Sequence, residues 1–270
     1  MSRRQWRYGL LIGLSVIAVI LGLQLMGPRL TPQSSSQPSA SLLVAAAASL
    51  QNPLQAIAAL DSPDLANVSI RYTFAASGVL QRQIEQGAPI DILIAAAEKQ
   101  MQALQEQGLI LTDTRSNLLT NQLVLVVPKT ALPSVARFQD LVQPQIKRLA
   151  IGEPRSVPAG HYALEVLENL GILEQVRPKF VLSNNVKAVL TAVETGNVDA
   201  GIVYWTDAQA SSKVAVVSVA DRSLHSPIVY PIAIVRSSRS LPQAEQYLEF
   251  LKREPAQAIF QRYGFGRPAA

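Results

Sequence analysis

Hydroxyl-bearing and small residues stand at several points of this chain where a strand-like run gives way to a helix-like run. The clearest case is residues 151–163, in which an apolar run ends at Ile151, a loop follows, and Pro158 opens a run with helical spacing. The first turn of a helix exposes unpaired backbone N–H groups and the positive end of the helix dipole. Small residues such as Ala159 and Gly160 let an anion approach those groups, so this stretch is compatible with anion binding.

The same order of strand, small or hydroxyl residue and helix recurs along the chain. Ser49, Ser77 and Val186 each stand at or near the start of a predicted helix, and Tyr204 carries a hydroxyl to the end of a predicted strand. Ligands of α/β sheets bind beyond the carboxyl ends of the strands, so we expect these positions to converge. The candidate ligand-binding residues are Ser49, Ser77, Ala159, Val186 and Tyr204.

Each candidate also has an ordinary structural interpretation. Ser49 and Ser77 could cap their helices without touching a ligand, and Tyr204 could end a buried strand with its hydroxyl in water. The recurrence of the pattern favours one shared site. His161 and His225, the only histidines, are too far apart in sequence to suggest a metal cluster, so we interpret both as structural.

The motifs of common hydrolases and nucleotide-binding proteins are missing from the sequence. No serine is flanked as in Gly-x-Ser-x-Gly, and neither a phosphate-binding loop nor His-Glu-x-x-His occurs. The chain has no cysteine, which excludes thiol catalysis, disulfides and a lipid-modified N-terminal cysteine. We therefore expect no enzymatic activity and no cofactor, and an exported hydrolase is a remote alternative.

Strand-like and helix-like segments alternate from residue 41 onward, which predicts an α/β architecture with mostly parallel sheets. Two near-continuous apolar runs, 122–128 and 228–235, are typical of strands buried on both faces, and we interpret them as crossings between two units. The prediction is two Rossmann-like α/β domains joined by two crossing strands, with a cleft between them. The predicted domain bounds are 42–122 with 232–270 for domain I, and 123–231 for domain II.

The first 28 residues are typical of a signal peptide or signal anchor. Arg3, Arg4 and Arg7 precede residues 8–26, a run without charge that is about long enough to span a bilayer. Residues 29–41 are rich in Ser, Pro and Gln, which predicts a disordered linker. We expect export to the periplasm; the sequence leaves open whether the segment is cleaved or anchors the protein in the inner membrane.

The net charge of +5 comes mostly from the N-terminal segment. Four of the 24 basic residues precede position 41, so the remainder carries 20 basic residues against 19 acidic residues. A nearly neutral body lacks the positive surface that a polyanion would require. Nucleic acid is therefore not an expected partner.

Several segments together resemble one bacterial family. They lie in that family's order over nearly all of the exported part of the chain: AAASL (46–50), ASG (76–78), QIEQGAPID (83–91), NQLVLVVPK (121–129), IGEPRSVPAG (151–160), VETG (193–196), GIVYWTDA (201–208) and RYGF (262–265). On these motifs the chain resembles the periplasmic molybdate-binding proteins of bacterial molybdate ABC transporters, which are type II periplasmic binding proteins.

The resemblance implies a ligand and a set of donors. A tetrahedral oxyanion would be bound through the hydroxyls of Ser49, Ser77 and Tyr204 and through backbone N–H groups around Ala159 and Val186. Molybdenum would be bound by these five residues only as its oxyanion and not as a bare metal ion. The resemblance also implies a monomer that closes two domains around molybdate and delivers it to a membrane permease driven by a cytoplasmic ATPase.

Two positions depart from the family's pattern. Glu153 stands where the family more often has Asp, in a loop that we expect to lie away from the ligand. Trp205 follows the candidate tyrosine where a small residue is commoner, and it could narrow the mouth of the cleft.

The chemistry of such a site can be argued from its donors alone. Phosphate near neutral pH often keeps a proton and would need an acceptor, yet no carboxylate falls at the five candidate positions. Molybdate, tungstate and sulfate are fully deprotonated, and a cage sized for the larger ions would leave donors unpaired around sulfate, at about 1–3 kcal/mol each. The leading hypothesis is molybdate and tungstate capture; a receptor for sulfate or another small oxyanion, and a membrane-anchored sensor ectodomain, stay open.

Overall fold

A computed structural model describes residues 40–60, 62–65, 68–130 and 135–268, all within one compact unit, Ser39–Ala270. The predicted signal segment, 1–28, and most of the predicted linker, 29–41, lie outside the described residues. No helix in the described ranges combines the length and the apolar character needed to cross a bilayer.

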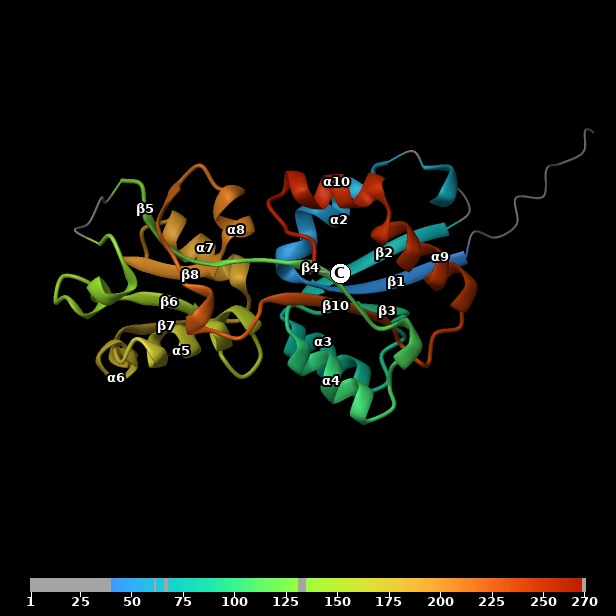
Figure 1. Ribbon diagram of the computed structural model, residues 1–270, viewed down its shortest axis with the longest axis horizontal. Coiled ribbons are helices and arrows are strands. Elements are labelled where there is room, and N and C mark those ends of the chain that lie inside the picture. Colours follow the sequence, from blue (N-terminus) through green and yellow to red (C-terminus); the bar gives the residue numbers. More distant parts are fainter. Residues whose placement is uncertain (1–39, 61, 66–67, 131–134, 269–270) are drawn as a thin grey trace, which may run out of the picture. The chain divides into compact units, whose positions relative to one another are not determined.

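The first sheet joins segments from both ends of the unit (Figure 1). Its order is β2-β1-β3-β10-β4, in which β2, β1 and β3 are parallel and β10 runs antiparallel to both β3 and β4. The strands are β1 (Ala40–Ala47), β2 (Val68–Ala75), β3 (Ile92–Ile94), β4 (Ser116–Thr120) and β10 (Val229–Ile234).

The second sheet repeats this arrangement with the middle of the chain. Its order is β7-β6-β8-β5-β9, in which β7, β6 and β8 are parallel and β5 runs antiparallel to both β8 and β9. The strands are β5 (Leu123–Pro128), β6 (Leu149–Gly152), β7 (Phe180–Ser183), β8 (Ala200–Tyr204) and β9 (Val214–Val219).

The expectation of mostly parallel sheets is only half right, because each sheet has two parallel and two antiparallel strand pairings. The strand that runs against its neighbours in each sheet, β5 or β10, is fourth in the strand order and comes from one of the two long apolar runs. All residues of β5 are buried, as the sequence predicts. The strand β4 was not predicted from the sequence; its five residues begin with the polar pair Ser116 and Asn117.

The chain passes from one sheet to the other twice. Asn121 and Gln122 separate β4 in the first sheet from β5 in the second, and residues 220–228 separate β9 in the second sheet from β10 in the first. The domain bounds at 122/123 and 231/232 stay predictions.

Helices cover both faces of each sheet (Figure 1). Around the first sheet, α3 and α4 pack together on one side, and α10 packs against α2 on the other. The segment 241–260, predicted as one or two helices on the first unit, forms α9 and most of α10. The helices are α2 (Gln51–Ala58), α3 (Ser77–Glu85), α4 (Glu98–Glu106), α5 (Pro158–Asn169), α6 (Leu173–Val176), α7 (Val186–Glu194), α8 (Trp205–Gln209), α9 (Leu241–Lys252) and α10 (Glu254–Arg262).

Local sequence explains where the site-forming helices begin and end. Pro158 is the first residue of α5, and Asn185 caps α7 by accepting a hydrogen bond from the Ala188 N–H at 2.9 Å. After α3 the chain turns at Gly87, whose φ of 82° is a backbone conformation that favours glycine.

Candidate functional site

The structure brings all five candidate residues to the lining of one small cavity between the two sheets. Ser49 and Ser77 come from segments that follow β1 and β2 of the first sheet. Ala159, Val186 and Tyr204 come from the ends of β6, β7 and β8 or the helices that follow them. The other lining residues are Ala47, Ala48, Ala75, Ala76, Ala96, Val157, Pro158 and Asn185. Small side chains therefore leave hydroxyl and backbone groups as the main polar features.

Two glycines bring the start of α5 close to the end of β6. A Cβ added to Gly160 would lie 2.0 Å from the Gly152 carbonyl oxygen, and a Cβ on Gly152 would lie 2.4 Å from a methyl group of Val157. Neither position tolerates a side chain without a shift of the backbone. This close packing holds the first turn of α5, including the Ala159 N–H, at the edge of the sheet.

Ser77 is fully buried and is the first residue of α3. Its hydroxyl does not cap the helix, because the N-cap is Ala76 and no side-chain cap hydrogen bond forms. Instead, Ser77 Oγ accepts a hydrogen bond from the Ala96 N–H at 2.9 Å. The Ser77 proton is therefore available to another acceptor, and the capping alternative is wrong for this residue.

Ser49 lies in a 3-10 turn, Ala48–Leu50, that precedes α2. It is not the N-cap of that turn or of α2, so the capping alternative is wrong here as well. The buried Ser49 Oγ lies 2.9 Å from Tyr230 Oη on β10. Sequence reasoning missed Tyr230, although a tyrosine within an apolar strand is a signal for a buried hydroxyl that needs a partner.

Tyr204 ends β8 with only 1% of its surface exposed. Its Oη is buried and has no hydrogen-bond partner in the part of the chain that the structure describes, so the alternative of a hydroxyl in water is wrong. Burial raises the pKa of Tyr204 well above its usual value, and the neighbouring Tyr230 adds to this shift. Tyr204 therefore remains a protonated donor beside the cavity at any physiological pH.

Two charged residues, both missed by sequence reasoning, lie next to this neutral cavity. Lys187 follows Val186, and its Nζ donates to Asn52 Oδ1 at 2.9 Å. Asp207 lies on α8 and is 4% exposed. With Ser49 they line a neighbouring pocket of about 150 Å³. Asp207 follows Tyr204 by about one helical turn, and this spacing was the sequence signal that could have placed Asp207 near the site.

The Asp207 carboxyl is held in an unusual electrostatic state. Burial raises the pKa of Asp207 to about 7, while the Lys187 charge and a hydrogen bond with the Tyr204 backbone oppose that shift. Burial also lowers the pKa of Lys187. Within the described residues no group of three or more His, Cys, Asp or Glu side chains could hold a metal ion.

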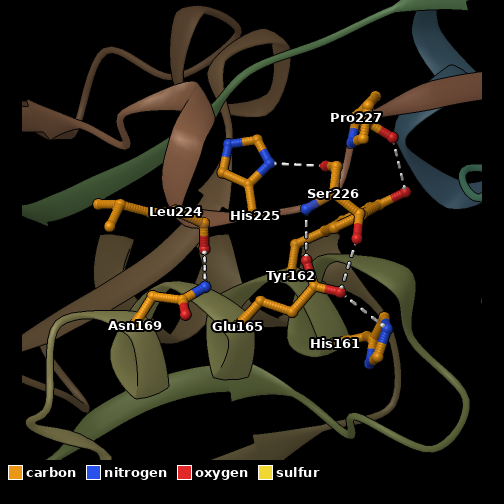
Figure 2. Close-up of polar contacts among 8 residues, drawn as sticks. All are labelled: His161, Tyr162, Glu165, Asn169, Leu224, His225, Ser226 and Pro227. Carbon is orange, nitrogen blue, oxygen red and sulfur yellow. Dashed lines mark hydrogen bonds and ion pairs between the residues drawn. The ribbon is translucent and has the colours of Figure 1, made fainter.

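Both histidines make local polar contacts (Figure 2). His161 Nε2 lies 3.2 Å from a carboxylate oxygen of Glu165, and that carboxylate also accepts from the Ser226 N–H at 2.6 Å. His225 Nδ1 lies 2.8 Å from the Ser226 carbonyl oxygen. Figure 2 shows these side chains where residues 224–227 pass over α5. The hydrogen bonds that join this return crossing to α5 come from Tyr162, Glu165 and Asn169.

Neither of the two residues that depart from the family pattern, Trp205 and Glu153, lines the small cavity. Trp205 is not among its lining residues and packs against the hydrophobic core, close to Gly264. Glu153 forms a salt bridge with Arg155 at 3.1 Å on the exposed loop.

Two α/β sheets linked by two crossings, with a donor-lined cavity at the strand ends of both, are the architecture of a solute-binding protein. Residues 42–266 match the family model of bacterial extracellular solute-binding proteins, and the chain belongs to this family. The predicted fold class is thereby confirmed.

The similar proteins include several whose names state a ligand. The molybdate-binding protein ModA of Escherichia coli is 38% identical over 230 residues, covering 83% of this chain and 88% of its own. The ModA protein of Haemophilus influenzae is 35% identical, covering 84% and 90%. The solved periplasmic molybdate-binding protein of Azotobacter vinelandii is 26% identical with a TM-score of 0.75, covering 84% of this chain and 100% of its own.

Proposed function

We propose that this protein is the substrate-binding component of an ABC importer, and that it captures molybdate, and tungstate with it, in the cavity lined by the five candidate residues. The observation that carries the proposal is the buried Tyr204 Oη, which has no partner among the described residues and lines the same cavity as Ser49 and Ser77. An unpaired buried donor costs about 1–3 kcal/mol, which a bound acceptor would remove. The molybdate-binding relatives support the choice of ligand.

A cage of neutral donors suits a dianion. Hydrogen bonds to a charged acceptor contribute about 1.5–3 kcal/mol each, and hydroxyl and N–H donors avoid the cost of burying a cation beside the ligand. Because Ser77 Oγ already accepts from the Ala96 N–H, it has a proton to donate toward the cavity. A fully deprotonated oxyanion accepts from every such donor, whereas hydrogen phosphate brings a proton that needs an acceptor.

The mechanism is binding and closure, with no covalent step and no cofactor. The Gly78 N–H at the start of α3 donates to the Ser156 carbonyl at 3.0 Å, and Lys187 contacts Asn52. Both contacts join a segment of the first sheet to a segment of the second. Release to the permease would require both to break.

The proposed setting is the periplasmic side of the inner membrane, where the protein acts as a monomer with a permease as its partner and without nucleic acid. Residues 1–28 would provide export, as a cleaved signal peptide or a retained anchor. A receptor for sulfate uses the same donor chemistry and is the second candidate. The sulfate-binding protein SubI of Mycobacterium tuberculosis, 18% identical with a TM-score of 0.74, shows that this fold also occurs in a protein so named.

Calorimetric titration separates these candidates. The full chain, purified in mild detergent, is titrated with molybdate, tungstate, sulfate and phosphate in one buffer. We expect strong heats with molybdate and tungstate and none with sulfate or phosphate at the same concentrations. A sulfate signal without a molybdate signal would keep the fold and replace the ligand.

A further inference from the structure

A chain of hydrogen bonds, partly buried at Asn121 and fully buried at Tyr230, connects the two sheet crossings to Ser49. Asn121 lies between β4 and β5, where the chain first crosses, and its Nδ2 lies 3.1 Å from Tyr230 Oη. Tyr230 lies on β10, the strand that follows the return crossing, and its Oη lies 2.9 Å from Ser49 Oγ. Tyr230 is fully buried, so water does not compete for its hydroxyl.

The direction of this chain follows from its first member. Asn121 Oδ1 accepts from the Gln122 N–H at 2.9 Å, which places Nδ2 toward Tyr230 and toward Thr206 Oγ1 at 3.0 Å. An amide nitrogen only donates, so Tyr230 Oη accepts from Asn121. Tyr230 Oη keeps its own proton, and when that proton points to Ser49 Oγ, Ser49 accepts it and directs its own proton elsewhere.

We propose that Tyr230 is a positioning and specificity-determining residue that makes Ser49 an obligatory donor toward the ligand cavity. The proposal rests on the proposed function of that cavity. Tyr230 does not line the cavity itself; its hydroxyl contacts Ser49, and its ring packs against that of Tyr204 with 5.9 Å between the ring centroids. Burial raises the pKa of Tyr230, so its proton stays in place at every pH at which the protein functions.

The arrangement favours oxyanions without a proton. A Ser49 hydroxyl that is fixed as a donor forms a hydrogen bond with any oxygen of molybdate. It forms none with the O–H of hydrogen phosphate, because both groups would then be donors. When Tyr230 cannot donate, the Ser49 hydroxyl can rotate and offer a lone pair to a protonated anion. Loss of the Tyr230 hydroxyl should therefore weaken molybdate binding and narrow the preference for molybdate over phosphate.

A double-mutant cycle on the full chain tests this proposal. We expect Tyr230→Phe to weaken molybdate binding about 5- to 10-fold, the size of one ordinary hydrogen bond. Ser49→Ala should weaken binding at least as much. The double variant should bind about as well as Ser49→Ala alone, because phenylalanine keeps the ring beside Tyr204 and removes only the hydroxyl that contacts Ser49. Phosphate affinity relative to molybdate should rise in Tyr230→Phe.

Tyr247→Phe is the matched control. The fully buried Tyr247 Oη lies 2.7 Å from the Oη of half-buried Tyr72, and neither residue lines the cavity. This control should lose a comparable hydrogen bond and keep wild-type molybdate affinity. Asn121→Asp is a second test, and it leaves Tyr230 itself unchanged. The new carboxylate would accept the Tyr230 proton, so this variant should lose molybdate affinity as Tyr230→Phe does. Combined with Ser49→Ala, it should cause no further loss.

The outcomes are distinct. Unchanged affinity in Tyr230→Phe, or additive effects of Tyr230→Phe and Ser49→Ala, would overturn the positioning role while molybdate binding by the wild-type chain still stands. A wild-type chain that binds no molybdate would instead overturn the proposed function and this inference with it.

Discussion

The N–H of Gly78 and the carbonyl of Ser156 meet at 3.0 Å, and this backbone hydrogen bond joins the start of α3 to the loop before α5. The contact depends on the absence of a side chain. A Cβ added to Gly78 would lie 2.8 Å from both the Ser156 Cα and the Ser156 carbonyl oxygen. The two segments flank the candidate cavity, so their approach is part of the closed arrangement around it.

Gly78→Ala should hinder that approach. Because the obstacle is backbone rather than a flexible side chain, we expect at least a 10-fold loss of molybdate affinity with the fold retained. Calorimetry measures the affinity, and small-angle scattering with molybdate present should show a larger radius of gyration than in the wild type. Arg82→Ala, an exposed change on the same helix, is the control. Wild-type affinity in Gly78→Ala would show that this contact is unnecessary for binding.

Ser77→Ala and Tyr204→Phe should both weaken molybdate binding but differ in their effect on stability. Ser77→Ala leaves the Ala96 N–H buried without its acceptor, at a cost of about 1–3 kcal/mol in the free energy of unfolding. Tyr204→Phe removes a hydroxyl that has no partner among the described residues, so the ligand-free protein should be at least as stable as the wild type. Urea denaturation and calorimetry together test this contrast; unchanged affinity in both variants would remove the site assignment.

Molybdate should stabilise the native protein by mass action. A ligand that binds only the folded state adds about 2.7 kcal/mol at a concentration 100 times its dissociation constant. For a chain of this size the gain corresponds to a rise of about 5–11 °C in the melting temperature. Differential scanning fluorimetry measures the shift, with sodium chloride at matched ionic strength as the control. A flat response at saturating molybdate would count against this ligand.

Asp207 should make stability depend on pH. The pKa of an unfolded aspartate is about 3.9, and that of folded Asp207 is raised to about 7 by burial. Between these values the native state holds a proton that the unfolded state has released, so the free energy of unfolding falls as pH rises from about 4 to about 7. This penalty is absent below pH 4 and complete above pH 7.

Asp207→Asn should remove that penalty. We expect the variant to be more stable than the wild type at pH 8, by up to about 4 kcal/mol, and equally stable near pH 4. Chemical denaturation at both pH values measures the difference, and Asp113→Asn, on an exposed turn, is the control. A pH-independent difference would mean that Asp207 is not the titrating group.

Local sequence determined the elements and the positions of the candidate site. Proline and asparagine at helix starts, apolar runs and small residues act over a few neighbouring positions, so α5, α7 and the ends of β6 and β8 could be predicted directly. The convergence of Ser49, Ser77 and Tyr204 could also be anticipated, because parallel strands present their carboxyl ends at one edge of a sheet.

The tertiary structure alone decided what those residues touch. Ser49 and Tyr230 are separated by 181 residues, and no local pattern in either segment specifies the other. The antiparallel addition of β5 and β10, the Gly78–Ser156 contact and the burial of Asp207 depend in the same way on how distant segments pack. Such partners are chosen by the complementarity of whole surfaces, whereas helix and strand formation responds mainly to near neighbours, so only the folded chain reveals which donors face the cavity and which hold them there.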